Sequence, residues 1–177
     1  MRRIALILSV LLFPVFVAHL VLAAGMFKIG EKAPPFTLTT ITGETLGLDS
    51  YTGKVVVLGL FHICEPCMMQ GMALQKVSEM TKGKAVAVLG VNSSGDSKKS
   101  VDEFLSAFPV KVTYPYLLDP NKVTDKLYGG GKFIPNVYVI DQQCAIHWQR
   151  VGSMDLAGEE AIVEEVEKLL AAGSKKM

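Results

Sequence analysis

The sequence has no excess of charge of either sign. Its 177 residues contain 18 lysines and arginines against 17 aspartates and glutamates, and the basic residues form no block. A protein that binds nucleic acid gathers basic side chains on one surface, because it must neutralise backbone phosphates. The even balance therefore predicts no nucleic-acid partner.

Cysteine is also scarce, with three in the chain. Cys64 and Cys67 are separated by two residues, whereas Cys144 is remote in sequence. A zinc site needs a tetrahedral ligand set, and without a second Cys-x-x-Cys pair it would have to recruit Cys144, His62 or His147. A structural disulfide closing so short a loop stabilises a fold little, because the stabilisation grows with loop length. These absences favour a redox-active dithiol, with a metal site as the alternative.

Charge is missing altogether from residues 4–25, which follow Arg2 and Arg3. This apolar run is long enough to cross a bilayer as a helix, and the arginines before it predict that the rest of the chain lies outside the cytoplasm. Small residues at 23–25 also fit a signal-peptidase site. We expect residues 1–25 to be a signal peptide or membrane anchor and residues 26–177 to form one domain in the periplasm or on the outer face of the cytoplasmic membrane, where disulfides persist.

The remaining apolar runs and turn residues predict alternating strands and helices. Residues 54–63 are dominated by a β-branched run, which is typical of a central strand buried on both faces. We expect strands at residues 36–38, 44–48, 54–63, 85–91, 116–118, 136–140 and 145–151, and helices at residues 64–80, 100–108, 121–128 and 158–172. The first two strands would form an N-terminal hairpin. The order implies an α/β, thioredoxin-like fold, with a central mixed sheet flanked by helices on both faces.

The most informative motif is Cys64-Glu65-Pro66-Cys67, between a predicted strand and a predicted helix. A thiol at the first turn of a helix faces unpaired backbone N–H groups and the positive end of the helix dipole, and both favour the thiolate that attacks disulfides. Cys67, about one turn further, can attack the mixed disulfide that Cys64 forms. Pro66 suits a first turn and the Glu65 charge opposes the thiolate slightly, so we expect both to tune the pair.

An ordered series of segments makes the chain resemble the membrane-anchored thioredoxins of the TlpA/ResA type and the related reductases of cytochrome c maturation. The segments are residues 30–38, 53–58, 64–67, 114–119, 134–141 and 151–152. The resemblance covers about residues 29–170. It implies thiol–disulfide exchange on exported proteins, with the dithiol as the redox group and no further cofactor. It also implies that Pro135 is cis and faces the dithiol.

Ile134 and Pro135 are the predicted binding platform. A proline at this point would keep the chain from pairing further, so the backbone of Ile134 would be free to bind an extended substrate segment by strand addition beside Cys64. The alternative is a proline that merely opens a strand.

Three positions depart from the family pattern. Ile63 stands where an aromatic residue is usual, Gln70 where a carboxylate is often found, and Met72 where a proline is common. Gln70 cannot accept a proton from Cys67, and the strand before the motif supplies no buried aspartate. The proton acceptor of Cys67 is therefore an open question, with water, Glu65 and a carboxylate elsewhere in the chain as candidates.

Other residues have a functional and a structural interpretation. Met68, Met69 and Met72 are soft ligands that suit copper, but methionines also fill gaps and form adaptable surfaces. His62, next to the motif, could raise the thiolate content or simply pack. We expect Cys144 to be a bystander thiol in a turn. Residues 129–132 resemble a phosphate-binding loop only superficially, because Phe133 replaces the required Ser or Thr.

The preferred function is an extracytoplasmic thiol:disulfide oxidoreductase with Cys64 and Cys67 as its catalytic pair. The resemblance implies reduction of disulfides in exported proteins such as apocytochrome c, with a membrane thiol-disulfide transporter supplying electrons. A peroxiredoxin-like thiol peroxidase is an alternative, although residues 59–63 lack the usual Pro and Thr/Ser pattern. Two further alternatives are a copper- or zinc-binding chaperone and an anchored adaptor without catalysis.

Overall fold

In the computed structural model, which describes residues 27–129, 134–152, 154 and 156–174, the centre of the sheet is strand β3 (Val55–Phe61). Every residue of β3 is buried. It pairs in parallel with β4 (Val86–Asn92) and antiparallel with β6 (Asn136–Ile140). A strand with neighbours on both sides and cover on both faces accommodates apolar, β-branched side chains, as the sequence of β3 predicts.

The outer strands extend the sheet in both directions. β5 (Tyr116–Leu118) runs parallel to β4, and the hairpin of β1 (Thr37–Thr40) and β2 (Thr45–Gly47) adds to β5 antiparallel. β7 (Ile146–Val151) pairs antiparallel with β6 at the other edge. The strand order β2-β1-β5-β4-β3-β6-β7 confirms a mixed sheet with a parallel centre.

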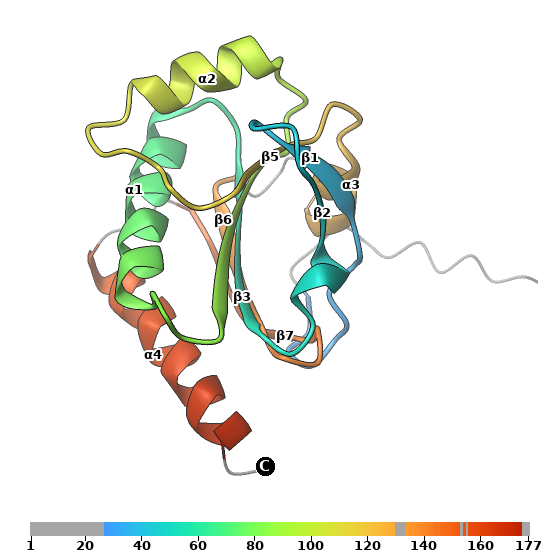
Figure 1. Ribbon diagram of the computed structural model, residues 1–177, viewed down its shortest axis with the longest axis vertical. Helices are drawn as coiled ribbons and strands as arrows, with labels where there is room; N and C mark the ends of the chain where they lie inside the picture. Colours follow the sequence, from blue (N-terminus) through green and yellow to red (C-terminus); the bar gives the residue numbers. More distant parts are fainter. Residues whose placement is uncertain (1–26, 130–133, 153, 155, 175–177) are drawn as a thin grey trace, which may run out of the picture.

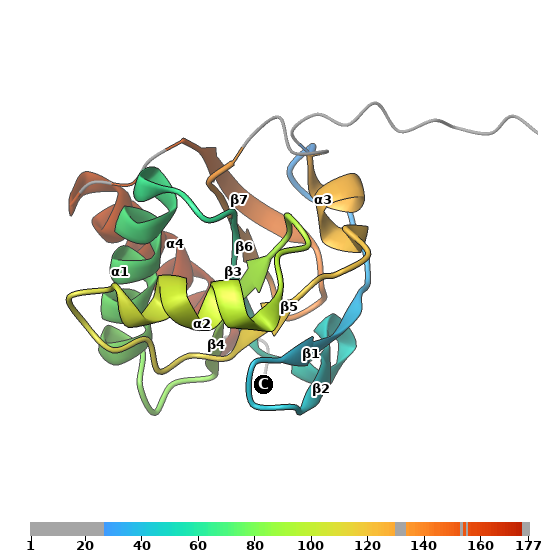
Figure 2. The same cartoon turned by 90° about the horizontal axis from the view of Figure 1, so that it is seen from above.

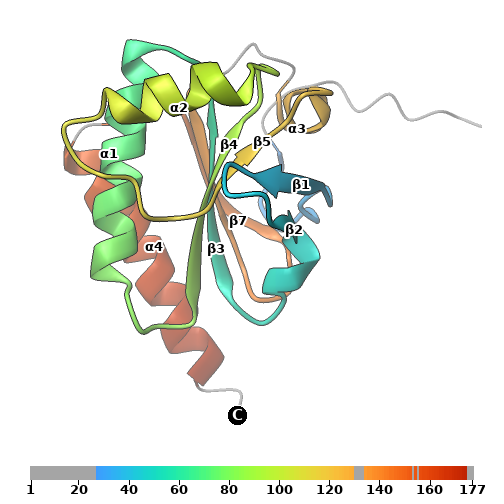
Figure 3. The ribbon, with the colours of Figure 1, turned by 45° about the horizontal axis from the view of Figure 1, so that its top comes forward.

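The helices divide between the two faces. α1 (Glu65–Met80) and α4 (Leu156–Ser174) lie side by side on one face, and α2 (Lys98–Ser106) lies across the end where α1 begins (Figures 1 and 3). α3 (Val123–Tyr128) and the short 3-10 helix η1 (Leu48–Tyr51) lie on the opposite side (Figure 2). Each face has its own apolar core, one beneath α1, α2 and α4 and one beneath α3, η1 and the N-terminal segment.

The predicted elements are all present, with boundaries that differ by a few residues. The central strand ends at Phe61 rather than at Ile63, because His62 and Ile63 leave the sheet to enter the loop before α1. η1 was not predicted. The predicted anchor or signal segment, residues 1–25, and residues 130–132 of the glycine-rich segment lie outside the described residues. Within the part that the structure describes, none of the helices combines the length and apolar character needed to cross a membrane.

Candidate active site

The dithiol lies at the junction of β3 and α1. Cys64 is the N-cap residue of α1, Pro66 stands in its first turn, and a disulfide joins Cys64 to Cys67. The Cys64 Sγ accepts the backbone N–H of Cys67 at 3.2 Å, in the way that side-chain oxygens cap other helices. This N–H and the helix dipole favour negative charge on the Cys64 sulfur once the disulfide opens. The structure thus places the pair where the sequence predicted it.

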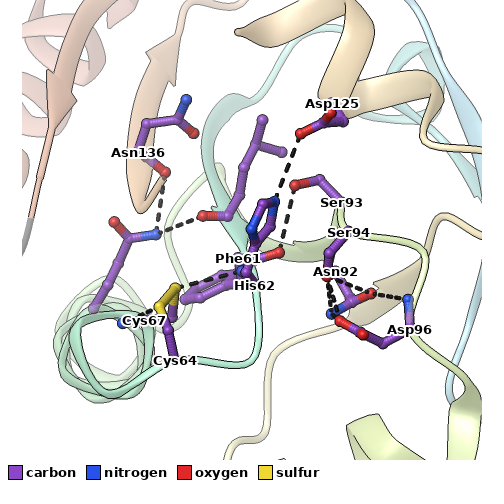
Figure 4. The surroundings of a disulfide bond; sticks show 12 residues. Phe61, His62, Cys64, Cys67, Asn92, Ser93, Ser94, Asp96, Asp125 and Asn136 are labelled. Atoms are coloured by element: carbon purple, nitrogen blue, oxygen red, sulfur yellow. Dashed lines mark hydrogen bonds and ion pairs between the residues drawn. A yellow bond between two sulfur atoms is a disulfide. The ribbon is translucent and has the colours of Figure 1, made fainter. Parts of the chain in front are cut away.

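The two sulfurs have different surroundings. Cys64 is half-buried, whereas Cys67 has no exposed surface, so an external disulfide can reach only Cys64. The Cys67 Sγ accepts the backbone N–H of His62 at 3.4 Å (Figure 4). A hydrogen bond to a sulfur favours its charged form and opposes the effect of burial. Sequence reasoning looked for a side-chain partner and missed this backbone donor.

Gln70 lies one turn after Cys67 and is completely buried. Its Nε2 donates to the backbone carbonyl of Leu60 at 3.3 Å and to that of Asn136 at 3.1 Å. Its Oε1 has no hydrogen-bond partner among the described residues. The position that the family often fills with an acid therefore holds a neutral donor that contacts two strands.

A buried polar network continues from Asn136 across the sheet. The Asn136 Nδ2 donates to the hydroxyl of Tyr138 at 3.1 Å and to the carbonyl of Tyr128 at 3.4 Å, and the Tyr138 hydroxyl donates to the same carbonyl at 2.6 Å. Burial raises the pKa of Tyr138 to about 12, although the hydrogen bond with Asn136 lowers it, so the hydroxyl stays a donor. An asparagine inside an otherwise apolar strand was the sequence signal for this network.

His62 faces away from the disulfide. Its imidazole points toward Asp125 of α3, and the Nε2 and Oδ1 atoms are 3.6 Å apart (Figure 4). Asp96, in the loop after β4, accepts hydrogen bonds from Ser94 and from Asn92. Burial raises the pKa of Asp96, but these bonds and the charges of His62 and Lys122 outweigh it and leave the pKa below its ordinary value. Sequence reasoning singled out neither carboxylate.

The predicted platform lies at the same end of the sheet. The Ile134–Pro135 peptide bond is cis, as the resemblance implied, and the Pro135 carbonyl accepts the N–H of Gly152 at 2.8 Å. Ile134 packs in the same apolar cluster as Cys64 and Cys67. No described residue hydrogen-bonds to the backbone of Ile134. The structure therefore places the dithiol and the two platform residues at the same end of the sheet.

Exposed apolar side chains lie close to the dithiol in sequence. Ile63 is 42% exposed and Met69 is 48% exposed, and these two residues flank the Cys64-Glu65-Pro66-Cys67 turn in sequence. Glu65 is exposed and is the charged residue of the turn itself. Met68 and Met72 are partly buried and pack against the core, which agrees with the structural interpretation of these methionines.

Cys144 lies far from this region in the fold. It is a free thiol in the turn between β6 and β7, with a left-handed backbone (φ 60°), and its Sγ lies 3.7 Å from the hydroxyl of Thr52. Within residues 27–129, 134–152, 154 and 156–174, no three histidine, cysteine or acidic side chains form a group that could hold a metal ion.

Comparison with known proteins agrees with this geometry. Residues 29–149 match the AhpC/TSA family. The thioredoxin-like protein YneN of Bacillus subtilis is 30% identical over 127 residues, which are 71% of this chain and 72% of YneN. A Coxiella burnetii protein assigned as the peroxiredoxin bcp is 28% identical over 70% of this chain and 89% of its own length. The thiol-disulfide oxidoreductase ResA of Halalkalibacterium halodurans is 24% identical over 93% of this chain and 89% of its own.

A solved structure also resembles this chain in fold and sequence. A Chlorobium tepidum protein assigned as the thiol:disulfide interchange protein DsbE superposes with a TM-score of 0.72 and 29% identity, covering 81% of this chain and 98% of that one. The family model, the relatives YneN and ResA, and the fold all point to thiol–disulfide chemistry. The chain therefore belongs to the AhpC/TSA family and is a thiol-disulfide oxidoreductase of the thioredoxin-like TlpA/ResA type.

Proposed function

We propose that this oxidoreductase works outside the cytoplasm and reduces disulfides of exported proteins, apocytochrome c among them. The observation that carries the proposal is the asymmetry of the pair, with an accessible Cys64 at a helix start and a buried Cys67, at the end of the sheet where the cis-proline lies. The charge-free segment after Arg2 and Arg3 supports the location, because it suits an export signal or an anchor.

The reaction follows from the two environments. The Cys64 thiolate attacks one sulfur of the substrate disulfide, which forms a mixed disulfide and releases one substrate thiolate. The Cys67 thiolate then attacks the Cys64 sulfur, which forms the Cys64–Cys67 disulfide and releases the second substrate thiolate. Two electrons pass from the dithiol to the substrate. A membrane thiol-disulfide transporter would return them by the same exchange.

Ile134 and Pro135 would hold the substrate during this exchange. No described residue hydrogen-bonds to the backbone of Ile134, which supports pairing with an extended segment, and the exposed Ile63 and Met69 support contact with its apolar side chains. Glu65 and Pro66 would tune the pair, through a charge near the sulfur and a fixed first turn. These features fit an unfolded polypeptide better than a small disulfide.

A trapping experiment tests the proposal. Cys67→Ser, in a Cys144→Ser background, should accumulate mixed disulfides with exported proteins through Cys64 in the native compartment. Non-reducing gels and mass spectrometry identify the partners, and a variant that also carries Cys64→Ser is the control. An absence of adducts, or adducts that persist in the control, would contradict the assignment.

The reduction potential of the Cys64–Cys67 couple tests the direction. A reductant should equilibrate near the value of thioredoxin, about −270 mV, whereas an oxidant would lie near −120 mV. Equilibration with glutathione or dithiothreitol followed by alkylation of the free thiols measures it.

A thiol peroxidase is the second candidate, favoured by the similarity to the peroxiredoxin bcp. It would require Cys64 to be oxidised by peroxide to a sulfenic acid, which Cys67 would then resolve as a disulfide with loss of water. Peroxide consumption by the purified protein, abolished in Cys64→Ser, would support this activity. Disulfide reduction without peroxide consumption would exclude it.

A further inference from the structure

We propose that Gln70 is a positioning residue that holds the dithiol helix and the strand after Pro135 in one geometry, and that does so at every pH because it is an amide. The proposal rests on the proposed function, since it concerns how the substrate platform is aligned with Cys64. It assigns a role to the position where the sequence showed only a missing acid.

The contacts of Gln70 define the alignment. Leu60 and Asn136 are opposite each other in the β3–β6 ladder, and the Gln70 Nε2 donates to the carbonyl oxygens of both. β3 leads from Leu60 into the loop that ends at Cys64, and β6 begins directly after Pro135. One buried amide therefore connects α1 to β3, which leads to Cys64, and to β6, which follows Pro135.

The network beyond Asn136 extends this connection to α3. The Asn136 side chain lies on the opposite face of the sheet from Gln70 and donates to the carbonyl of Tyr128, the last residue of α3. Tyr138 donates to the same carbonyl. Asn136 is thus bonded to α1 through its backbone and to α3 through its side chain.

The two carbonyl oxygens determine which chemical group fits here. Because both accept, the amide nitrogen must face them, and the Oε1 is directed elsewhere. An ionised carboxylate would place its negative oxygens against both carbonyls and offer no donor. A protonated carboxyl could donate to one of them only. Glutamine supplies both donors regardless of pH.

Burial of the Gln70 side chain has a cost at its acceptor atom, Oε1. The atom is buried and has no partner among the described residues, and such atoms are rare in folded proteins because they cost stability. An apolar side chain of similar size would avoid this cost. An apolar side chain, however, could not donate to the carbonyl oxygens of Leu60 and Asn136.

Two measurements on Gln70→Leu separate positioning from general damage. Reduction of insulin disulfides needs the platform, whereas alkylation of Cys64 by iodoacetamide needs only the thiolate. In a Cys144→Ser background we expect kcat/KM for insulin to fall about tenfold or more, with the alkylation rate within about twofold of the parent. Gln75→Leu is the matched control, since Gln75 is also buried on α1 but bonds to Thr113 and Glu79; both rates should stay within about twofold.

Gln70→Glu tests the pH argument without removing a side chain. Burial against two carbonyls would raise the pKa of this carboxyl above its unfolded value. The variant should therefore resemble the parent at low pH and lose both stability and kcat/KM as the pH rises through the raised pKa. The parent should show no such loss.

The outcomes are distinct. Equal losses of insulin reduction and alkylation in Gln70→Leu, or no loss of either, would overturn the positioning role. A Gln70→Glu variant that follows the parent at every pH would do the same. If the parent itself reduces no protein disulfide, the proposed function fails and this inference fails with it.

Discussion

Helix α1 buries one glutamine in each half, and the two are accommodated differently. In the second half, residues 73–80, Gln75 has every polar atom satisfied: its Nε2 donates to Glu79 and Thr113, and its Oε1 accepts the N–H and the hydroxyl of Thr113. In the first half, residues 65–72, the Gln70 Nε2 donates to two carbonyls and its Oε1 has no partner in the part of the chain that the structure describes. The dithiol is formed by Cys67 of the first half and the N-cap residue Cys64, whereas the second half is remote from the two sulfurs in sequence.

This difference shows how the fold divides stability and chemistry within a single element. Leu74 and Val77 in the second half are completely buried in the apolar core. The first half instead combines an exposed Met69 with the fully buried Cys67 and Gln70. A buried acceptor without a partner costs about 1–3 kcal/mol, which the second half and its core can offset.

The largest effect should come from Cys64→Ser, at the N-cap that precedes the first half. Insulin-reduction activity should fall at least about a thousandfold, because the oxygen nucleophile cannot replace the thiolate. The free energy of unfolding should change little, since the disulfide closes a very short loop. Turbidity assays and urea denaturation measure the two quantities.

Cys144→Ser is the matched control for this prediction. Its thiol lies in the β6–β7 turn, remote from α1, so activity and stability should both be retained. A comparable loss of activity in Cys144→Ser would move the chemistry away from the first half of α1.

Leu74→Ala should produce the opposite pattern in the second half. Leu74 is completely buried, and its truncation should cost about 2–5 kcal/mol of unfolding free energy. Activity per folded molecule should stay within about twofold, because Leu74 contacts the core rather than the site. Urea denaturation, with insulin assays well below the transition, tests this. A proportionate loss of specific activity would mean that the halves are not separable.

Gly71→Ala tests the boundary between the halves. A Cβ at this position would lie 2.4 Å from Cε1 and 2.8 Å from Cζ of the buried Phe108 ring. The resulting shift should cost about 1–3 kcal/mol, against a gain of about 1 kcal/mol in helix propensity, so the net loss is at most about 2 kcal/mol. Denaturation beside Ser78→Ala, expected within about 0.5 kcal/mol of the parent, gives the contrast. A stabilised Gly71→Ala would show that Phe108 can move at no cost.

Much of this comparison was predictable from local sequence. The β-branched run of β3, the apolar spacing of α1 and the Cys-x-x-Cys motif between them placed the site correctly. Each of these patterns involves only residues that are close in sequence, so hydrophobic periodicity is enough to predict the strand and the helix. The cis geometry at Pro135 came from the family resemblance rather than from such patterns.

The contacts that refine the site were not predictable in this way. Gln70 and Asn136 are 66 residues apart, and His62 meets Asp125 only because α3 folds back beside the end of β3. The sequence showed that Gln70 could not be a base. It could not show that two carbonyls would face it, since that depends on the register of β3 and β6. Tertiary register, rather than propensity, decides such contacts.

The smallest expected effect concerns Asp96, which lies beside Asn92 and Ser94 in the loop after β4 (Figure 4). Burial raises its pKa, but hydrogen bonds from Ser94 and Asn92 and the charges of His62 and Lys122 lower it further, so the folded pKa lies below the unfolded one. The ionised carboxylate therefore stabilises the fold above the ordinary pKa of about 3.9, and this stabilisation is lost as the pH falls through the folded pKa.

Asp96→Asn should thus be less stable than the parent at neutral pH, by about 1 kcal/mol or less, which is about 4 °C or less in melting temperature. The difference should shrink as the pH falls through the folded pKa of Asp96, because the parent carboxylate becomes protonated there. Asp102→Asn, which removes an exposed pair with Lys98, is the control and should change the melting temperature less at neutral pH. A constant difference between Asp96→Asn and the parent across this range would mean that the shape of the Asn92–Asp96 loop, and not the charge of Asp96, supports the site.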